Sequence, residues 1–455
     1  MSSEITGEDL AGKWLLPKFI DNHIHLLPMG LDLQKLHLGA CTSREDVLDA
    51  VRSRLASLEP GAWLLAVHYD QNKFADGQHV TRAQLDALSS SPIILRHVNG
   101  HAGVVNSAAF AAAGVDETTP DLPGGVYERG ADGRLTGFVT EDAHDHISSF
   151  SPNPNLDQMV DAILTAGDRL ASMGIGTVAD MHTGWLDLDQ ELTAYRLAAE
   201  RGCKVRVRLY LRWSSVFGPR AVPYTFENTD RCRIAGVKIF ADGAIGSATA
   251  AIYGEFQSHP PTRKATDGQL IYSPERLHSM IRTADEAGYS VAIHSIGDHA
   301  TDLVLAGYAA TSDPRRHRIE HAMLLSDAQI EKLHAVGCHC CTQPEFLVRF
   351  GHAYRRQLGD ARASSLIRLR SLSEAGIPLS LSSDNPIVKG DPWDGLRCAV
   401  HRPAGFDGAE NLALDVAWDG YGWRAADAMG DGDLGRVEPG CADDLMVLDS
   451  LEVPA

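Results

Sequence analysis

The stretch that decides the fold is Pro17-Lys-Phe-Ile-Asp-Asn-His-Ile-His-Leu26, which follows an apolar run beginning at Trp14. These residues predict a β-strand that leads directly into the pair His23 and His25. On a strand, residues i and i+2 point to the same face, so the two imidazoles project side by side. Two rigidly held imidazoles are half of a first-row metal site, typical of Zn²⁺ or Fe²⁺. Because such a pair can also be a packing feature, the interpretation depends on further ligands at other strand ends.

The composition is that of a soluble globular protein. The chain has 455 residues, of which 44% are hydrophobic and 22% are charged, enough for one large domain with insertions or for two to three ordinary domains. The formal net charge of −19 argues against nucleic acid and against an anionic membrane as partners. No apolar run has the length of a membrane span, and residues 1–13 lack the apolar core of a signal peptide. We therefore expect a cytoplasmic protein.

The cysteines follow no disulfide-framework spacing. The segment Cys338-His-Cys-Cys341 looks like a metal-binding motif at first sight. It lies in a short apolar run that ends at Gln343-Pro344, however, and alternating cysteines are common in buried strands. We therefore interpret the segment as structural. The full set is Cys41, Cys203, Cys232, Cys338, Cys340, Cys341, Cys398 and Cys441.

The chain becomes regular from residue 177 onward, where short β-rich runs alternate with helical segments. With the strand before His23, the runs make eight βα units, and this pattern predicts a parallel (β/α)8 barrel. The seven later strands are expected at 177–181, 205–211, 236–240, 289–294, 316–321, 338–342 and 377–383. We assign residues 14–30 and 150–435 to the barrel. Residues 31–149 are too long for a simple connection, so we expect them to form an inserted subdomain between strands one and two.

Polar side chains suited to metal chemistry stand at the ends of several predicted strands. Barrels of this kind build their active sites at the C-terminal ends of the strands. In strand order, the side chains are His23 and His25, Lys238, His294, His321 and Asp384. Each alone has a structural alternative: Asp384 could be a turn residue, and Lys238 could be ion-paired. Together, in this order, they predict a metal-dependent active site.

The stretches around these residues resemble the amidohydrolase superfamily and, within it, the amidohydrolase-3 (YtcJ-like) group. The resemblance covers nearly the whole chain, and the combination of motifs is specific although no single motif is. Besides the histidine pair, the matching stretches are Gly100-His-Ala-Gly-Val-Val-Asn-Ser107, Gly236-Val-Lys-Ile-Phe-Ala-Asp-Gly-Ala-Ile-Gly-Ser247, Ile293-His-Ser-Ile-Gly-Asp298, Ile319-Glu-His321 and Ser382-Ser-Asp-Asn-Pro386.

The resemblance implies a metal-binding role for the residues at the strand ends. It implies that His23 and His25 bind the more buried of two metals and that His294 and His321 bind the second. It also implies that Lys238 is carboxylated and bridges the two metals. The chemistry agrees, because an ammonium has no lone pair and lysine can bridge metals only as an anionic carbamate. The implied cofactor is Zn²⁺, two ions per chain, with Fe²⁺, Mn²⁺ or Co²⁺ as alternatives.

The implied catalytic residues are Asp384, Lys238 and His101. Two metals would share one hydroxide, whose pKa falls far below that of free water. Asp384 would contact the first metal, accept the proton of the attacking hydroxide and pass it to the leaving nitrogen. Asp242 and Glu320 flank ligand strands and are expected to orient the ligands. Candidates for substrate contact, each with a scaffold role as the alternative, are His97, His101, Asp298 and Gln343.

The sequence departs from the family at its two ends. The family usually carries a β-sandwich formed by an N-terminal stretch and the C-terminal tail. Here the histidine pair arrives early, so we expect a reduced or absent sandwich, with residues 1–13 and 436–455 as its remnant. The apolar segments Trp14-Leu-Leu16 and Leu445-Met-Val-Leu448 should pair with each other or be covered in a homodimer.

The sequence therefore predicts an enzyme that cleaves a C–N bond other than a peptide bond. The bond would belong to an amide, N-acyl or N-formyl group of a small molecule and would be attacked by a metal-activated hydroxide. Ester, lactone or cyclic-imide hydrolysis, deamination and isomerisation are alternatives on the same metal centre. A catalytically silent barrel used for binding is the alternative outside enzymes, and the complete ligand set argues against it. The substrate does not follow from the sequence, because barrel loops diverge freely.

Overall fold

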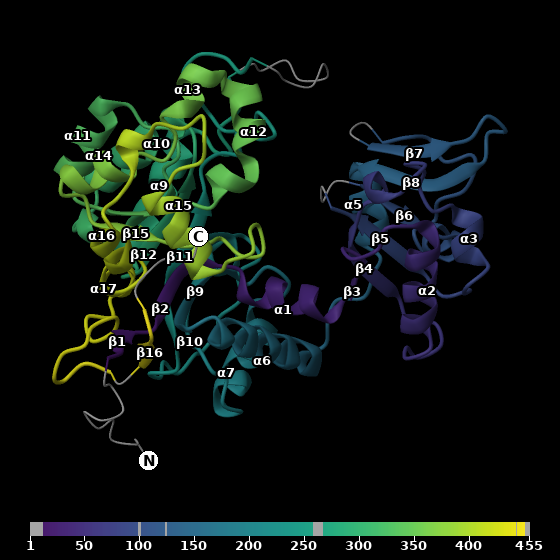
Figure 1. Cartoon of the computed structure of the whole chain (residues 1–455), viewed down its shortest axis with the longest axis horizontal. Helices are drawn as coiled ribbons and strands as arrows, with labels where there is room; N and C mark the ends of the chain where they lie inside the picture. Colours follow the sequence, from purple (N-terminus) through teal and green to yellow (C-terminus); the bar gives the residue numbers. More distant parts are fainter. Residues whose placement is uncertain (1–11, 99–101, 123–124, 258–266, 443, 451–455) are drawn as a thin grey trace. The chain divides into compact units, whose positions relative to one another are not determined.

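In the computed structural model, the chain divides into two compact units (Figure 1). The larger unit contains Met1–Met29 and Ile163–Ala455, and the smaller unit is Gly30–Ala162. The structure describes residues 12–98, 102–122, 125–257, 267–442 and 444–450. Two helices, α1 (Leu26–Gln34) and α6 (Leu156–Ser172), contain the points at which the chain passes between the units. None of the helices in the described ranges has the length and apolar character needed to cross a membrane.

The larger unit is built on an eight-stranded parallel sheet with the order β15-β14-β13-β12-β11-β10-β9-β2. The sheet nearly closes on itself, because Asp384 N donates to His23 O at 2.7 Å and Ser383 N donates to Asp21 Oδ1 at 3.0 Å. The predicted (β/α)8 barrel is therefore confirmed, with every strand at its expected place. The strands are β2 (Phe19–Ile24), β9 (Ile175–Thr183), β10 (Arg206–Arg212), β11 (Cys232–Phe240), β12 (Ser290–Ser295), β13 (Arg318–His321), β14 (His339–Thr342) and β15 (Leu379–Leu381).

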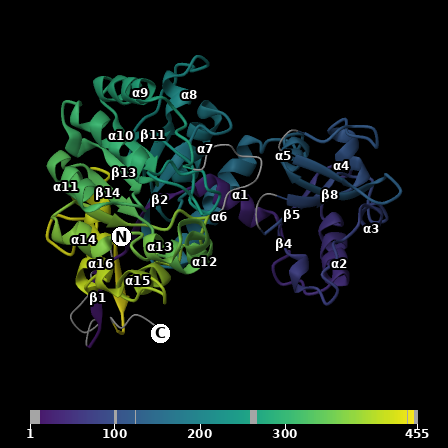
Figure 2. The same ribbon diagram turned by 90° about the horizontal axis from the view of Figure 1, so that it is seen from above.

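Helices follow the strands and lie outside them, as Figure 2 shows for α10 and α11. Local sequence signals set their ends. The helix α11 begins at a capping box formed by Ser326 and Gln329 and ends at Gly337, whose φ of 75° suits glycine. The helices of this unit are α7 (Leu188–Glu200), α8 (Trp213–Phe217), α9 (Pro274–Glu286), α10 (Asp298–Ala309), α11 (Asp327–Val336), α12 (Phe346–Leu358), α13 (Asp360–Ser364), α14 (Leu369–Glu374), α15 (Pro392–Val400), α16 (Leu414–Gly420) and α17 (Trp423–Asp427).

Two short strands near the chain ends form a separate ribbon. The strand β1 (Trp14–Pro17) pairs antiparallel with β16 (Leu445–Leu448), and Trp14 lies opposite Leu448. This is the first of the two arrangements expected for these apolar segments. Lys18 extends the contact, because its backbone N donates to Asp444 O and its Nζ lies 2.8 Å from Asp444 Oδ1.

The smaller unit is a six-stranded mixed sheet with the order β3-β4-β5-β6-β8-β7. Alternating residues give it two apolar faces: Leu64, Ile93 and Val104 contribute to one buried cluster, and Ile94 and Val105 contribute to another. Helices α2 and α3 supply residues to the first cluster, and α4 and α5 supply residues to the second. The elements are β3 (Leu36–His37), α2 (Arg44–Leu55), β4 (Leu64–Tyr69), α3 (Arg82–Asp86), β5 (Ile93–His97), β6 (Ala102–Val105), α4 (Ser107–Ala112), β7 (Gly125–Arg129), β8 (Leu135–Glu141) and α5 (Asp142–Ser148).

Candidate metal centre

Three predicted ligands converge where β2 meets the segment after β15. Asp384 Oδ1 lies 3.0 Å from His25 Nε2 and 3.5 Å from His23 Nε2. The ligand atoms of these three residues all lie within 4.8 Å of one another. Asp384 Oδ1 is buried and accepts no hydrogen bond from the residues that the structure describes. A buried carboxylate oxygen in this position is suited to a cation, because ring nitrogens and a carboxylate are the donors that first-row metals bind.

Glu320 fixes the tautomer of His23. His23 Nδ1 donates to Glu320 Oε2 at 2.5 Å, so its lone pair is on Nε2, which faces Asp384. Arg318 donates to both Glu320 oxygens and also to Asn22 O at 2.9 Å. Burial alone would raise the pKa of Glu320, but the charges of Arg318 and Lys238 outweigh this effect and lower it. The result is an ionised carboxylate that holds His23 in position.

Lys238 lies inside the barrel beside these ligands. Its Nζ is 3.3 Å from His23 Nε2 and 5.1 Å from the centre of the Phe240 ring. The side chain is fully buried, and burial lowers the pKa of Lys238 to about 8. A lysine with this pKa is neutral in an appreciable fraction near neutral pH, and the neutral amine is the form that can add CO₂.

His294 and His321 lie side by side, with ring centres 4.5 Å apart. His321 Nδ1 donates to Gln343 Oε1 at 2.7 Å, which leaves its Nε2 with a lone pair. His294 Nε2 donates to Gly243 O at 2.9 Å, which leaves its Nδ1 with a lone pair. The His23 ring centre lies 4.8 Å from that of His321, so the two histidine pairs form one continuous cluster.

The buried histidines are held in the neutral form that metal binding requires. Burial and the neighbouring Lys238 lower the pKa of His23 well below its ordinary value. Burial lowers the pKa of His321 in the same direction, with His294 and His23 adding to the shift. Burial, followed by the charge of Lys238, lowers the pKa of His294 to about 3. All three rings therefore offer a lone pair without having to lose a proton at neutral pH.

Cys341 also lies near His23 and Glu320. Its thiol donates to Asn22 Oδ1 at 3.2 Å, and burial raises the pKa of Cys341 well above its ordinary value. A protonated thiol is a poor metal ligand. Cys338, Cys340 and Cys341 are buried and form no disulfide, in agreement with the structural interpretation of this segment.

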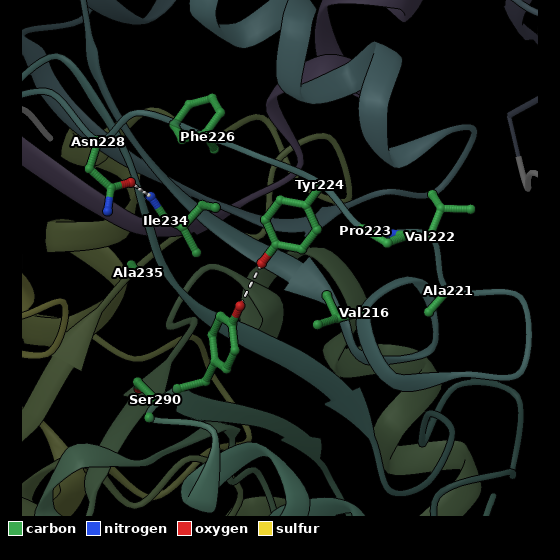
Figure 3. Close-up of a pocket in the computed structure, with 12 residues that line it drawn as sticks. Val216, Ala221, Val222, Pro223, Tyr224, Phe226, Asn228, Ile234, Ala235 and Ser290 are labelled. Carbon is green, nitrogen blue, oxygen red and sulfur yellow. Dashed lines mark hydrogen bonds between the residues drawn. The ribbon is translucent and has the colours of Figure 1, made fainter.

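A cavity of about 300 Å³ opens at the C-terminal ends of β9, β10 and β11 and reaches Lys238. Its wall includes His182, Trp185, Arg212 and Phe240. A larger cavity of about 730 Å³ lies at the other ends of the strands, lined by Ile234 near the start of β11 and by Ser290 at the start of β12. The hydroxyl groups of Tyr224 and Tyr289 lie 2.5 Å apart there. Figure 3 shows Tyr224 in this cavity with a dashed line from its hydroxyl group. Of these two cavities, the smaller one reaches Lys238, which contacts His23 of the histidine cluster.

Comparison with known proteins places this arrangement in a family. Residues 6–455 match the amidohydrolase family. The chain belongs to this family. It is 31% identical to the putative amidohydrolase YtcJ of Bacillus subtilis, over 89% of this chain and 77% of that protein. It is 26% identical to the N-substituted formamide deformylase of Arthrobacter pascens, over 97% of this chain and 84% of that protein.

A solved structure shares the fold of this amidohydrolase. It is that of an uncharacterized metal-dependent hydrolase from Pyrococcus furiosus, with a TM-score of 0.81 and 27% sequence identity. The match covers 97% of this chain and 88% of that structure. The likeness therefore includes the smaller unit as well as the barrel.

The remaining predicted residues of this amidohydrolase have other partners. Asp242 accepts three backbone N–H groups, from Ala251, Ile296 and Gly297, and its Oδ1 lies 3.7 Å from His294 Nε2. Gln343 contacts His321 and also donates to Ser382 Oγ at 2.9 Å, so it holds the His321 ring in position.

Three candidates for substrate contact have a different outcome. Asp298 accepts hydrogen bonds from Tyr253 N and from Arg362, and these contacts join three segments of the barrel. His97 lies in the smaller unit, where its Nε2 is 2.8 Å from Gln71 Oε1. His101 lies outside the described residues.

Two residues beside the candidate metal centre could not be picked out from the sequence, and both lie at the end of β9. Asp180 accepts hydrogen bonds from Leu26 N at 2.9 Å and from Tyr195 OH at 2.5 Å, so it fixes the chain just after His25. The His182 ring lies 6.2 Å from the His25 ring and 5.2 Å from the Phe240 ring. The signal in the sequence is Asp180-Met-His182 at the end of a predicted strand, the same kind of place that holds the candidate metal ligands.

Proposed function

We propose that this amidohydrolase is a metal-dependent enzyme that cleaves a C–N bond in an amide, N-acyl or N-formyl group of a small molecule. The observation that carries the proposal is the convergence of His23 Nε2, His25 Nε2 and Asp384 Oδ1, which accepts no hydrogen bond from the described residues, beside a buried lysine. The relatives named as a formamide deformylase and as a metal-dependent hydrolase support the choice of reaction.

The donor atoms of His23, His25 and Asp384, all within 4.8 Å of one another, fit one divalent ion, and we propose a second ion beside it, with Zn²⁺ as the default for both. His23, His25 and Asp384 would hold one ion, and His294 and His321 would hold the other. Lys238, as its carbamate, would lie between them. When bound, such ions supply a hydroxide at neutral pH and polarise the carbonyl that it attacks.

The chain's own groups account for the proton transfer and for the orientation of the ligands. Asp384, whose Oδ1 lies between the two histidines, is placed to accept the proton of the attacking water and deliver it to the leaving nitrogen. Glu320 accepts a hydrogen bond from His23 Nδ1, and Gln343 accepts one from His321 Nδ1. These bonds leave the Nε2 atom of each ring with its lone pair directed into the site.

A substrate panel tests the proposal. The zinc-loaded protein should release formate or an amine from at least one class of N-formyl or N-acyl amine, and a chelator should abolish this activity. His25→Asn should lose it, whereas His334→Asn, which alters an exposed histidine at the end of α11, should keep it. Hydrolysis of esters or lactones without any hydrolysis of amides would favour an esterase or lactonase reaction on the same metal centre. No turnover on the whole panel would favour the silent barrel.

A further inference from the structure

Arg212 is the last residue of β10 and lies beside the proposed metal centre. It is the register partner of Lys238 on β11, and its neighbour Leu211 is the partner of Thr183 on β9. Arg212 therefore lies between the strand that carries Lys238 and the strand that ends near His182. All three of these side chains, those of Arg212, Lys238 and His182, line the 300 Å³ cavity.

The guanidinium of Arg212 has no acidic partner among the residues that the structure describes. Other arginines of the barrel strands do have one: Arg206 pairs with Asp444 at 2.6 Å, Arg208 pairs with Asp431 at 2.6 Å, and Arg318 pairs with Glu320. Arg212 is thus a cation in the wall of the 300 Å³ cavity that can bind an anionic group of a substrate.

Trp185 holds this guanidinium in place from one side. The Arg212 Cζ lies 5.2 Å from the centre of the Trp185 ring, a cation–π contact. The loop carrying Trp185 is itself fixed, because Gly184 N and Leu186 N donate to the two oxygens of buried Glu191 at 2.7 Å and 2.6 Å. A guanidinium held over an aromatic face can still donate two parallel N–H···O hydrogen bonds to a carboxylate.

We propose that Arg212 binds a carboxylate of the substrate, so that the preferred substrates are N-formyl or N-acyl amino acids or similar acyl amines with one acid group. This inference rests on the proposed function for the bond that is cleaved. Arg212 and Lys238 line the same cavity. One small molecule can therefore place its acyl nitrogen at the metal centre and its acid group at Arg212.

Matched pairs of acid and amide test the inference. N-formylglycine and both enantiomers of N-formylleucine are compared with their carboxamides, by kcat/KM of the zinc-loaded enzyme and by calorimetric binding. The wild type should favour the acid in at least one pair. Arg212→Gln should lower kcat/KM for that acid by about 10- to 100-fold, the usual effect of losing a charged hydrogen-bond partner, and leave the amide nearly unchanged.

Two variants control the experiment. Arg276→Gln removes an arginine that lies 5.1 Å from the Trp213 ring but is exposed on α9, and it should keep the preference for the acid. Arg212→Lys keeps the charge without the bidentate geometry and should give an intermediate preference, which separates recognition from a folding defect.

The outcomes separate this inference from the proposed function. Equal kcat/KM and equal binding for acid and amide in the wild type would overturn the role of Arg212 while leaving C–N hydrolysis in place. Binding that favours the acid and is lost in Arg212→Gln, without hydrolysis of either compound, would support the role of Arg212 and refute the proposed reaction. Failure of both compounds to bind would overturn the inference.

Discussion

At the scale of single residues, two of the proposed ligands have a backbone that L-amino acids rarely adopt. Asp384 has a φ of 63° and His321 has a φ of 74°. A left-handed conformation costs a non-glycine residue on the order of 1 kcal/mol or more, and such residues cluster at functional sites. Asp384 has this backbone conformation where its Oδ1 lies 3.0 Å from His25 Nε2. The strain is therefore located where ligand geometry is most demanding.

Asp384→Asn should keep the fold and most of the metal, because an amide oxygen can still coordinate. It should lower kcat by roughly 10²- to 10⁴-fold, the usual size of a general acid–base contribution. The effect should fall on kcat more than on KM, because the proton moves only along the reaction path. Steady-state kinetics with Asp415→Asn, an exposed residue of α16, as the control would measure it. Near-normal turnover of Asp384→Asn would mean that another group carries the proton.

Glu320→Gln should affect both stability and metal binding. The variant leaves the buried Arg318 without its charged partner, which typically costs about 3–5 kcal/mol in the free energy of unfolding. It also weakens the acceptor of His23 Nδ1, so metal affinity should fall by about 10- to 100-fold. Denaturant unfolding and competition with a chelator measure the two effects. Glu331→Gln, exposed on α11, should change neither, and a Glu320→Gln protein with wild-type stability and affinity would contradict this role.

At the scale of elements, Asp180 connects β9 to the start of α1. Its Oδ2 accepts from Leu26 N and Tyr195 OH, and its Oδ1 accepts from His182 N and from Thr183 Oγ1. Asp180 thus holds the turn that follows His25, and it does so from the neighbouring strand. The position of His25, a proposed ligand, is therefore set by contacts between elements as well as by the strand that precedes it.

Asp180→Ala should destabilise the barrel by on the order of 3 kcal/mol, because it leaves several buried donors without an acceptor. It should also reduce metal retention, because the chain after His25 loses its anchor. Tyr195→Phe removes only one of the donors and should cost about 1 kcal/mol. Thermal unfolding and metal analysis of both variants test this ordering. Equal losses in the two variants would show that Asp180 does not act as a shared acceptor.

The eight strands and their terminal histidines could be predicted because each strand is a short apolar run that ends in a polar residue. The partners of those residues could not, because they come from distant parts of the chain. Arg318, for example, donates to Asn22 O across 296 residues of sequence. The sequence alone does not distinguish Arg212 from Arg206 and Arg208 in the same strand. The acidic partners of Arg206 and Arg208 lie far away in the sequence and are known only from the structure.

At the scale of the whole molecule, the two compact units have separate buried clusters. One cluster joins Ile20, Ala179 and Tyr210 within the barrel, and two others lie on the faces of the six-stranded sheet. The proposed metal ligands all belong to the larger unit. Stabilisation by a ligand acts only on the part of the protein that binds it.

Calorimetric unfolding should therefore show two transitions, and zinc should raise the temperature of only one of them. Zinc at about 100 times its dissociation constant stabilises the binding unit by about 2.7 kcal/mol. The His23→Asn protein should retain both transitions and lose most of the zinc-dependent shift. A single cooperative transition that moves as a whole would contradict independent unfolding of the two units.

The measurement that tests the central claim most directly is anomalous diffraction at the zinc edge from crystals of the zinc-loaded protein. The account predicts one peak beside His23, His25 and Asp384 and a second beside His294 and His321, with extra density on Lys238 between them for a carbamate. Zinc peaks confined to other parts of the surface, with the histidine cluster empty, would contradict the metal centre and the hydrolytic function built on it.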